Sequence, residues 1–417
     1  MRKLSTILVP AAVVGLLAAT LPAGAANAAR TVPQPLFGQH VAGIASGTPG
    51  TLPVGTVGAI RLWDAGVTWR EVEIEDNKYD WTRLDAAVAN ARKLGAQEIL
   101  YTLGSTPRWA ASDPNSTLGL YGPGSNSHPK SNSLYTDYLK EVAARYKGLI
   151  TAYQVWNEAN LRDFYRGTPA QMAQLTKAAS IALDSVDPGA KLVAASTTVR
   201  AAGPVGKFGK AYGPAMKKVG WKYVDVVSAH FYPPATSGPG TRVAYIKKMK
   251  SYYKKYGAGK KPMWDGEMSF GDTRRYMKTK RLYTGETAAA YVARSYIDAM
   301  RYGVSRVFWY GWDIHVLGTD MTSRTDGSLT SGGQAYLTTR AWMSGQAWYG
   351  CKVKSSVTTC TIGSPTGKAT IRYASKPKTI TLPSGTWTVS KLDGSRTTVA
   401  GGTKIKVTAT PIHIART

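Results

Sequence analysis

Two glutamates stand at the ends of apolar segments, where a charge needs a purpose. Glu158 lies in "VWNEAN" after the apolar run "LITAYQV", and Glu267 lies in "KPMWDGEMSF". Burying a carboxylate is unfavourable unless it is paired or performs a function. Two carboxylates that face one another across a pocket can hydrolyse a glycosidic bond, because one protonates the leaving oxygen while the other attacks the sugar or activates water. Their separation decides between retention and inversion, and the sequence leaves it open.

The segments around these glutamates alternate between strand-like and helix-like patterns. Continuous apolar segments, typical of strands buried on both faces, predict strands at 35–43, 56–63, 97–104, 150–158, 191–197, 224–232, 261–268 and 305–313. Helical spacing predicts helices at 81–95, 133–148, 168–189, 210–220, 242–257, 284–303 and 332–345. Eight such units predict a (β/α)₈ (TIM) barrel over residues 30–345. An open doubly wound sheet is the alternative, but no Gly-rich phosphate loop follows the first strand.

The barrel prediction brings the two glutamates into one pocket. Functional side chains of such barrels lie at the C-terminal ends of the strands. Glu158 ends the fourth strand and Glu267 the seventh, and the 109 positions between them correspond to three strand–helix units. These strands lie across the barrel from each other. The other strand-end candidates are His40, Arg61, Trp63, Asp64, Thr106, Trp109, Asn157, Ser196, Thr197, His230, Tyr232, Trp309, Trp312 and Asp313.

Three motifs carry a family resemblance. "WNEAN", "HFY" and "KPMWDGEMSF" follow one another at the spacing of the fourth, sixth and seventh barrel strands. Together they resemble the retaining glycoside hydrolases of clan A, with family 39 and its relatives nearest, over roughly residues 35–345. The resemblance implies that Glu158 is the acid/base and Glu267 the nucleophile of a double-displacement mechanism.

The resemblance also implies roles for neighbouring residues. Arg61 is expected beside Glu267, where its positive charge keeps that carboxylate ionised. Tyr232 is expected to hydrogen-bond Glu267, and Asn157 to hydrogen-bond the 2-hydroxyl of the sugar. Further substrate contacts are expected from His230 in the sugar site, Trp309 as the platform under the sugar ring, His40 and Trp63.

The sequence departs from the family pattern around the second glutamate. Ala159 replaces the usual proline after Glu158, and Met268 is not the usual residue after Glu267. Asp265 stands where relatives usually have an apolar residue, and regular strand alternation places it on the same side as Glu267 but deeper in the barrel. Asp265 therefore needs a partner, for which Arg61 is a candidate, or the strand register slips.

The N-terminal residues have the pattern of a secretory signal peptide. Arg2 and Lys3 precede an apolar stretch, and "ANA" at 26–28 fits a cleavage site. A membrane anchor is the alternative, but the apolar run is short and contains Pro10. Residues 1–28 are therefore expected to be removed, and the mature protein to be secreted to the outside or the cell envelope without a membrane span.

Residues 346–417 change to short alternating strands with Gly, Pro and Asp-Gly turns. This pattern predicts a small, sandwich-like all-β domain. The chain has two cysteines, Cys351 and Cys360, and in an exported protein such a close pair predicts a disulfide. A loop this short gains roughly 2–3 kcal/mol from closure. Both cysteines lie far from the candidate site, so a thiol mechanism is not expected.

The charge balance bears on partners. The formal net charge is +28, and removal of Arg2 and Lys3 with the acid-free leader leaves 28 − 2 = +26. Such a surface attracts polyanions, including acidic polysaccharides, although a solvated surface is the plainer reading. Five basic residues in 273–286 are expected near the pocket mouth, either attracting an anionic glycan or lying in a solvated loop.

Other partners are not expected. The five histidines lack metal-ligand spacing, so neither a metal nor another cofactor is expected. Nucleic acid is disfavoured because the basic residues are dispersed and the chain is exported. A monomer is expected.

The sequence therefore predicts a secreted retaining glycoside hydrolase that acts on a polysaccharide or oligosaccharide. A non-catalytic carbohydrate- or envelope-binding protein on a degenerate barrel is the alternative. The sugar, its linkage and the choice between endo and exo action stay open, because the fold does not fix them.

Overall fold

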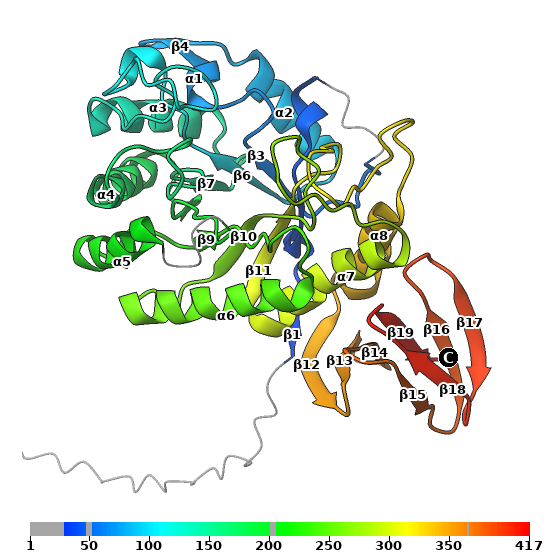
Figure 1. The fold of residues 1–417 in the computed structure, drawn as a ribbon. Coiled ribbons are helices and arrows are strands. Elements are labelled where there is room, and N and C mark those ends of the chain that lie inside the picture. The colour runs from blue at the N-terminus through cyan, green and yellow to red at the C-terminus, as the bar shows by residue number, and fades with distance from the viewer. Residues whose placement is uncertain (1–28, 47–51, 201–205, 365–366) are drawn as a thin grey trace, which may run out of the picture.

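The computed structural model describes residues 29–46, 52–200, 206–364 and 367–417. The predicted signal peptide, residues 1–28, lies outside the described residues. A parallel sheet surrounded by helices forms the larger part of the molecule, and antiparallel strands near the C-terminus form the smaller part (Figure 1).

Eight parallel strands form the larger sheet, in the order β8-β7-β6-β3-β2-β11-β10-β9. A parallel bridge between Val193 and Val226 joins the two ends of this order and closes the barrel. Seven strands lie within the segments that the sequence predicts, and β11 begins one residue before its predicted segment, which confirms the (β/α)₈ barrel. The strands are β2 Phe37–Gln39, β3 Ala59–Leu62, β6 Glu98–Thr102, β7 Ala152–Gln154, β8 Lys191–Val193, β9 Val227–Ala229, β10 Met263–Met268 and β11 Val304–Trp309.

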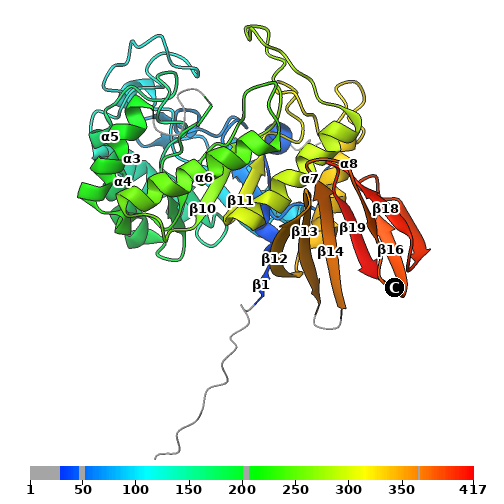
Figure 2. The same ribbon diagram turned by 60° about the horizontal axis from the view of Figure 1, so that its bottom comes forward.

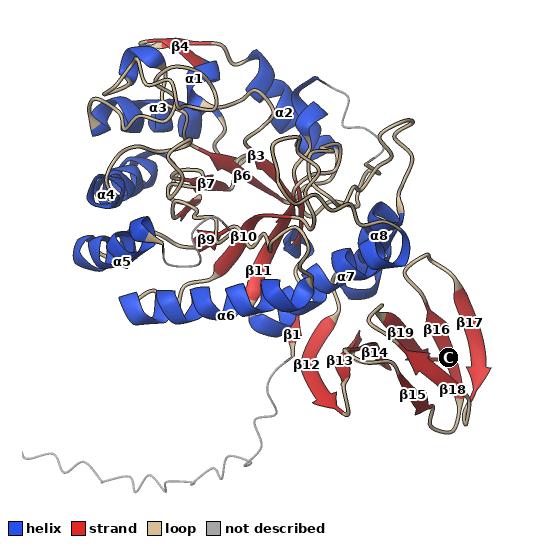
Figure 3. Cartoon of the chain, in the orientation of Figure 1, coloured by secondary structure: helices blue, strands red, loops and turns tan. Residues whose placement is uncertain are grey.

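Helices cover the outside of the barrel sheet (Figure 3). Their ends follow local sequence signals: Thr168 and Gln171 form a capping box at the start of α4, where Pro169 occupies the first turn. Gly257 ends α6 with a φ of 96°, a left-handed conformation that favours glycine. The long helices are α2 Thr82–Lys93, α3 Asn132–Arg145, α4 Pro169–Val186, α5 Lys207–Val219, α6 Pro239–Tyr256, α7 Gly285–Tyr302 and α8 Ser331–Met343.

Short elements complete the loops of the barrel. These are η1 Gln34–Leu36, η2 Ala42–Ser46, α1 Trp69–Val72, β4 Glu73–Glu75, β5 Lys78–Tyr79, η3 Arg108–Ala110 and η4 Trp221–Tyr223.

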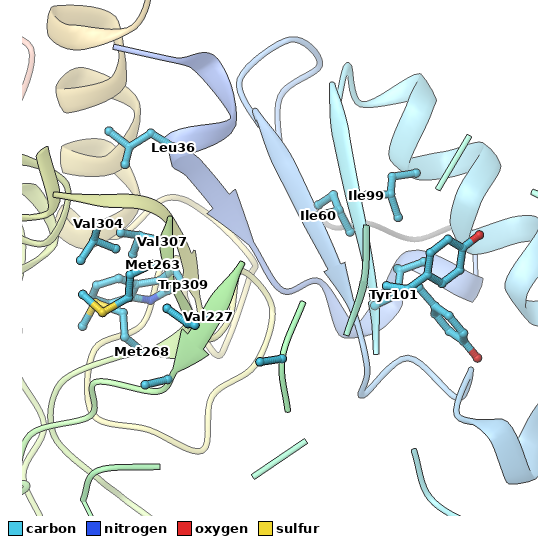
Figure 4. Packing of buried hydrophobic residues seen from close by; sticks show 14 of the residues in the cluster. Leu36, Ile60, Ile99, Tyr101, Val227, Met263, Met268, Val304, Val307 and Trp309 are labelled. Atoms are coloured by element: carbon cyan, nitrogen blue, oxygen red, sulfur yellow. The ribbon is translucent and has the colours of Figure 1, made fainter. Parts of the chain in front are cut away.

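Strand alternation separates two apolar layers. Side chains that point into the barrel form a compact interior plug, whose members are Ala59, Leu100, Ala152, Val193, Val226, Trp264 and Phe308. Side chains on the other face of the strands pack against the helices, and Figure 4 shows part of this layer around Val304, Val307 and Trp309. The plug fills the barrel centre, so the open space lies beyond the C-terminal strand ends.

The C-terminal strands form a β-sandwich-like unit. A seven-stranded antiparallel sheet has the order β1-β12-β13-β14-β19-β16-β17, and β15 and β18 form a separate ribbon. Two residues near the N-terminus, β1 Arg30–Thr31, pair with β12 and belong to this sheet although the prediction assigned residue 30 to the barrel. The strands are β12 Ala347–Lys354, β13 Val357–Ser364, β14 Gly367–Ala374, β15 Lys378–Thr381, β16 Thr386–Ser390, β17 Arg396–Ala400, β18 Lys404–Val407 and β19 Ile412–Arg416.

The predicted disulfide is present. Cys351 on β12 pairs with Cys360 on β13, with an S–S distance of 2.05 Å. The sheet that carries it packs beside α7 and α8 (Figure 2). Tyr373 donates a hydrogen bond of 2.7 Å to Asp298 of α7, and Trp342 of α8 stacks on His413. The apolar core therefore runs continuously from the barrel into the β unit.

Among the helices of the described residues, none is long and apolar enough to span a membrane.

Candidate active site

A cavity of about 480 Å³ opens at the C-terminal ends of the barrel strands. Both glutamates line it, together with Asn157 and Tyr232. A second cavity, of about 710 Å³, lies between α7, α8 and the β unit. Its acidic lining residues, Glu286 and Asp393, are exposed, so it lacks the buried, opposed carboxylates of the barrel mouth.

Glu158 follows β7 in a constrained backbone conformation. Its φ of 39° is rare for a residue with a side chain and marks a site where the surrounding structure imposes the geometry. Ser196 holds this turn, because its Oγ accepts a 2.9 Å hydrogen bond from the Glu158 backbone N–H. The carboxylate lies 3.0 Å from Nδ1 of His230. Burial raises the pKa of Glu158 to about 7, while a Thr198 hydrogen bond and Arg61 act in the opposite direction.

Glu267 lies in a different electrostatic environment. Arg61 donates from Nη1 to Oε1 of Glu267 at 2.5 Å, and the Tyr232 hydroxyl donates to Oε2 at 3.1 Å. Burial raises the pKa of Glu267, while His230, whose Nδ1 lies 3.4 Å from Oε2, and next the positive charge of Arg61 oppose that shift. The predicted contacts of Arg61 and Tyr232 with this glutamate are therefore present.

The two carboxylates are close together. One oxygen of Glu158, one oxygen of Glu267 and a ring nitrogen of His230 lie within 4.8 Å of one another. This limit, which applies to one oxygen of each group, lies nearer to the about 5–5.5 Å between the carboxyl groups of retaining glycosidases than to the roughly 6.5–9.5 Å of inverting ones. Burial lowers the pKa of His230 to about 3, and Nδ1 of this ring lies 3.0 Å from Glu158 and 3.4 Å from Glu267.

Arg61 is the centre of the hydrogen-bond network beneath the glutamates. Its Nη2 donates to Oδ1 of Asn157 at 2.8 Å, and Nε and Nη2 both donate to Oε1 of Gln154. Because a guanidinium can only donate, Asn157 presents its oxygen to Arg61 and keeps its NH₂ group for other partners. Gln154, which the sequence analysis missed, holds Arg61 from inside β7.

His40 lies behind this network and not in the cavity wall. Its Nε2 is 3.1 Å from the carbonyl oxygen of Gly266, and because a carbonyl only accepts, this nitrogen carries the proton. Arg61 approaches the same ring nitrogen at 3.4 Å. The imidazole is 1 % exposed, so it orients the strand that carries Glu267 and is remote from a substrate.

Trp309 is not the predicted platform. It is fully buried in the layer between the sheet and the helices, where Figure 4 shows it beside Met263 and Val307. Alternation along β11 explains the error: Phe308 points into the barrel and Trp309 outward, so the next inward residue is Tyr310. Tyr310 lines the cavity in its place.

Asp265 does not share a face with Glu267, and its partner is not Arg61. The pairing of β10 with β11 shifts register between Asp265 and Met268, and this irregularity turns Glu267 inward. Asp265 points to α6, where Arg242 donates to Oδ2 from Nε at 3.1 Å and from Nη2 at 2.7 Å. The register slip that the sequence left open is therefore real.

The turn between these two acids needs its glycine. A Cβ on Gly266 would lie 3.0 Å from Nε2 of His230 and 3.0 Å from Oγ of Ser228. These contacts are tight, so glycine allows the strand to approach the site closely.

The remaining strand-end candidates divide into two groups. Trp63 and Asp64 line the cavity. The others support the framework. Thr106 and Trp109 donate hydrogen bonds to the backbone carbonyls of Ser127 and Glu73, and Trp312 is buried in the core. Ser196 accepts from the Glu158 backbone, the Thr197 carbonyl accepts from the His230 backbone, and the Asp313 carboxylate accepts from the backbone of Ala42 and Gly43.

Several wall residues lie outside the regular strands. Tyr121 donates a hydrogen bond to the Asp64 carboxylate, whose pKa burial raises. On another side of the cavity are Arg200 and Arg274. Of these, only Arg274 had a signal in the sequence, as part of the basic segment 273–286.

The only group of metal-ligand type in the described residues is formed by Glu158, His230 and Glu267. It offers two carboxylates and an imidazole, but Arg61 already places a positive charge 2.5 Å from Glu267. A divalent cation here would be repelled by that guanidinium. The donor set therefore fits acid–base chemistry better than a resident metal.

The closed parallel sheet, its outer helices and the attached antiparallel strands define a (β/α)₈ barrel with a β-sandwich unit. Neither a protein-family model nor a curated protein matches the sequence.

Solved structures do share this fold. A family 39 glycoside hydrolase from Bacteroides cellulosilyticus WH2 matches with a TM-score of 0.67 and 18 % identity, covering 87 % of this chain and 76 % of that one. A glucosidase from Croceicoccus marinus matches with a TM-score of 0.67, 13 % identity and coverages of 93 % and 96 %. A GH39 β-xylosidase from Caulobacter crescentus matches with a TM-score of 0.63, 16 % identity and coverages of 94 % and 98 %. At these identities the likeness establishes the fold.

Proposed function

We propose that this protein is a retaining glycoside hydrolase in which Glu158 is the acid/base and Glu267 the nucleophile. The observation that carries the proposal is the pair of buried carboxylates, with oxygens within 4.8 Å, at the mouth of the barrel. The solved enzymes that share the fold include family 39 members, and the sequence resemblance to that family rests in part on Asn157 and Glu158.

The first step requires a protonated Glu158 and an ionised Glu267. Glu158 donates its proton to the glycosidic oxygen, and Glu267 attacks the anomeric carbon from the opposite face. The bond to the leaving sugar breaks, the leaving oxygen keeps the proton, and an ester bond forms between the sugar and Glu267.

The second step reverses the roles. Glu158, now a carboxylate, takes a proton from water while the water oxygen attacks the anomeric carbon. The ester bond breaks, Glu267 regains its negative charge, and Glu158 is again protonated. Two inversions at the same carbon give a product with the configuration of the substrate.

The electrostatics support this assignment of the two glutamates. Arg61 forms its direct ion pair with Glu267 alone, so a proton that the two carboxyl groups share is favoured on Glu158. A pKa near 7 suits a group that must give a proton in one step and take one in the next. Burial lowers the pKa of His230, which disfavours a positive charge that would drive this proton off.

The proposed setting is outside the cell. Residues 1–28 have the pattern of a cleaved leader, and the Cys351–Cys360 disulfide is of a kind that persists in oxidising compartments. The proposed substrate is a polysaccharide or oligosaccharide, and the mature charge of +26, obtained as 28 − 2, favours an anionic one.

A non-catalytic carbohydrate-binding protein is the competing reading. A binder has no need of two buried carboxylates in contact range, since their mutual repulsion and burial are unfavourable without a reaction to perform.

Azide rescue separates the two readings and assigns both roles. The Glu267→Ala and Glu158→Ala variants are incubated with activated aryl glycosides that the wild type hydrolyses, with and without azide. Glu141→Ala, which removes an exposed carboxylate on α3, is the matched control. We expect azide to give an inverted glycosyl azide with the first variant and a retained one with the second.

Two results contradict the proposal. If the wild type hydrolyses none of a broad panel of glycosides, the protein is better described as a non-catalytic carbohydrate-binding protein. Exchanged azide outcomes would show that the two glutamates have the opposite roles.

A further inference from the structure

The cavity carries different groups on its two sides. Glu158 at the end of β7 and Glu267 on β10 divide the ring of strands into two arcs. The arc through β6, β3, β2 and β11 contributes Asp64 and aromatic rings to the wall. The arc through β8 and β9 contributes Arg200, which follows β8 and lines the same cavity.

A buried carboxylate joins Arg200 to a second arginine. Asp272, which is 0 % exposed, lies 2.9 Å from Nη2 of Arg200 and 2.7 Å from Nη2 of Arg274. Arg274 also donates to Oδ1 from Nε at 3.0 Å and from its backbone N–H at 3.1 Å. Two guanidinium groups and one carboxylate leave one positive charge uncompensated, and both arginines line the cavity with partly exposed side chains.

This basic corner lies beside the acid/base and not beneath the nucleophile. Thr198, which hydrogen-bonds Glu158, precedes Arg200 by two residues. Arg61 occupies the space next to Glu267. In a retaining glycosidase the acid/base faces the glycosidic oxygen, so groups beside it contact the leaving sugar.

We propose that Arg200 and Arg274 bind the carboxylate of a uronic acid on the leaving side of the scissile bond. The proposal rests on the glycosidase function above and adds the chemical class of the leaving sugar. Guanidinium groups suit this ligand, because their planar N–H donors match the two oxygens of a carboxylate. The single uncompensated positive charge equals the charge of one uronate.

The opposite arc disfavours an anion. Asp64 lies there beside Tyr121, and the exposed Asp163 of the loop after β7 lines the same cavity, with its backbone carbonyl accepting from Leu120 of the loop after β6. A uronate on that side would meet carboxylates of like charge. The sugar that is transferred to Glu267 is therefore neutral, and the bond that is cleaved joins a neutral sugar to an acidic one.

Binding measurements test the subsite without turnover. The mature wild-type protein is titrated at low salt with D-glucuronate, D-galacturonate, D-glucose and D-galactose. We expect a uronate to bind about 10-fold more tightly than its neutral counterpart. Arg274→Gln and Arg200→Gln are expected to lose this preference. Arg275→Gln, which removes an exposed neighbouring charge outside the cavity wall, is expected to keep it.

Two binding results overturn the subsite. Equal affinities for acidic and neutral sugars in the wild type exclude it, and this comparison needs no variant. A uronate preference that survives in both cavity variants places the anion elsewhere. Near-ultraviolet circular dichroism identifies any variant that fails to fold.

Transfer to an acceptor tests the side of the bond. With an activated aryl glycoside as donor, a uronate in the leaving subsite gives a hydroxyl proton to Glu158. Its oxygen then bonds to the anomeric carbon while the ester bond to Glu267 breaks, which yields a disaccharide. We expect glucuronate to be a better acceptor than glucose, and equal transfer to both overturns the placement.

The two proposals fail in different ways. If the wild type hydrolyses no glycoside, the glycosidase function fails, while the titration still decides whether Arg200 and Arg274 bind a uronate. If it hydrolyses glycosides but shows no uronate preference in binding or transfer, the glycosidase function stands and the subsite is excluded.

Discussion

Replacement of Glu158 by glutamine is expected to stabilise the protein at neutral pH. Burial raises the pKa of Glu158 from its usual value of 4.5 to about 7. The folded protein therefore holds this proton more tightly than the unfolded chain. Below pH 4.5 both states are protonated and the site has no penalty. As the pH rises through the interval to about 7, the unfolded chain releases the proton first, and the stability of the folded state falls.

The size of the effect follows from the shift. A difference of about 2.5 pKa units at 1.36 kcal/mol each gives a penalty of ~3 kcal/mol above pH 7. The Glu158 side chain is 10 % exposed, so little of this is lost to solvent screening. Glutamine keeps the shape of the side chain and cannot ionise. Its advantage over the wild type is expected to grow by ~2–3 kcal/mol between pH 5 and pH 8.

Denaturant titrations at the two pH values measure this difference. The wild type, Glu158→Gln and the exposed control Glu141→Gln are unfolded in guanidinium chloride at pH 5 and pH 8. The control is expected to change by less than about 0.5 kcal/mol. A Glu158→Gln advantage that is the same at both pH values would refute the reasoning, because the carboxyl group would then have an ordinary pKa.

Further predictions concern the neighbours of the site. Arg61→Met is expected to lower kcat/KM by about 10³-fold, because Glu267 loses its cation. The acidic limb of the pH–rate profile is expected to move to higher pH, and an unchanged limb would show that Arg61 does not lower the pKa of Glu267. Trp309→Phe is expected to lower the free energy of unfolding by about 1–2 kcal/mol and to leave KM unchanged. A higher KM at unchanged stability would show that Trp309 is a sugar platform after all. Asp265→Asn is expected to cost about 3–5 kcal/mol, because Arg242 loses its buried counter-charge, while Asp137→Asn, in an exposed ion pair, costs under about 1 kcal/mol; equal losses would contradict this. Incubation with EDTA is expected to leave activity unchanged, and a loss that added metal restores would identify a catalytic ion.

The sequence predicts those features that regular repeats or motifs encode. The eight strands are visible because each is a continuous apolar run, and strand spacing then brings Glu158 and Glu267 into one pocket. The side that a residue faces is less accessible, because it depends on single-residue register. Phe308 points into the barrel, so strand alternation from this residue would have selected Tyr310 and not Trp309 as the next residue that faces the cavity.

Other features have no local signal. The register shift after Asp265 comes from tertiary packing around β10, and its arginine partner lies on α6, 23 residues earlier. Arg200 and Tyr121 reach the cavity from loops, whose paths no periodicity predicts.

The central claim is that Glu158 and Glu267 act in a double displacement, and the stereochemistry of the product tests it most directly. Proton NMR spectra are recorded in the first minutes of hydrolysis of an aryl glycoside that the wild type turns over, before the product mutarotates. We expect the first sugar formed to have the anomeric configuration of the substrate. A first product of inverted configuration would contradict it, because a single displacement by water needs no glycosyl-enzyme bond to Glu267.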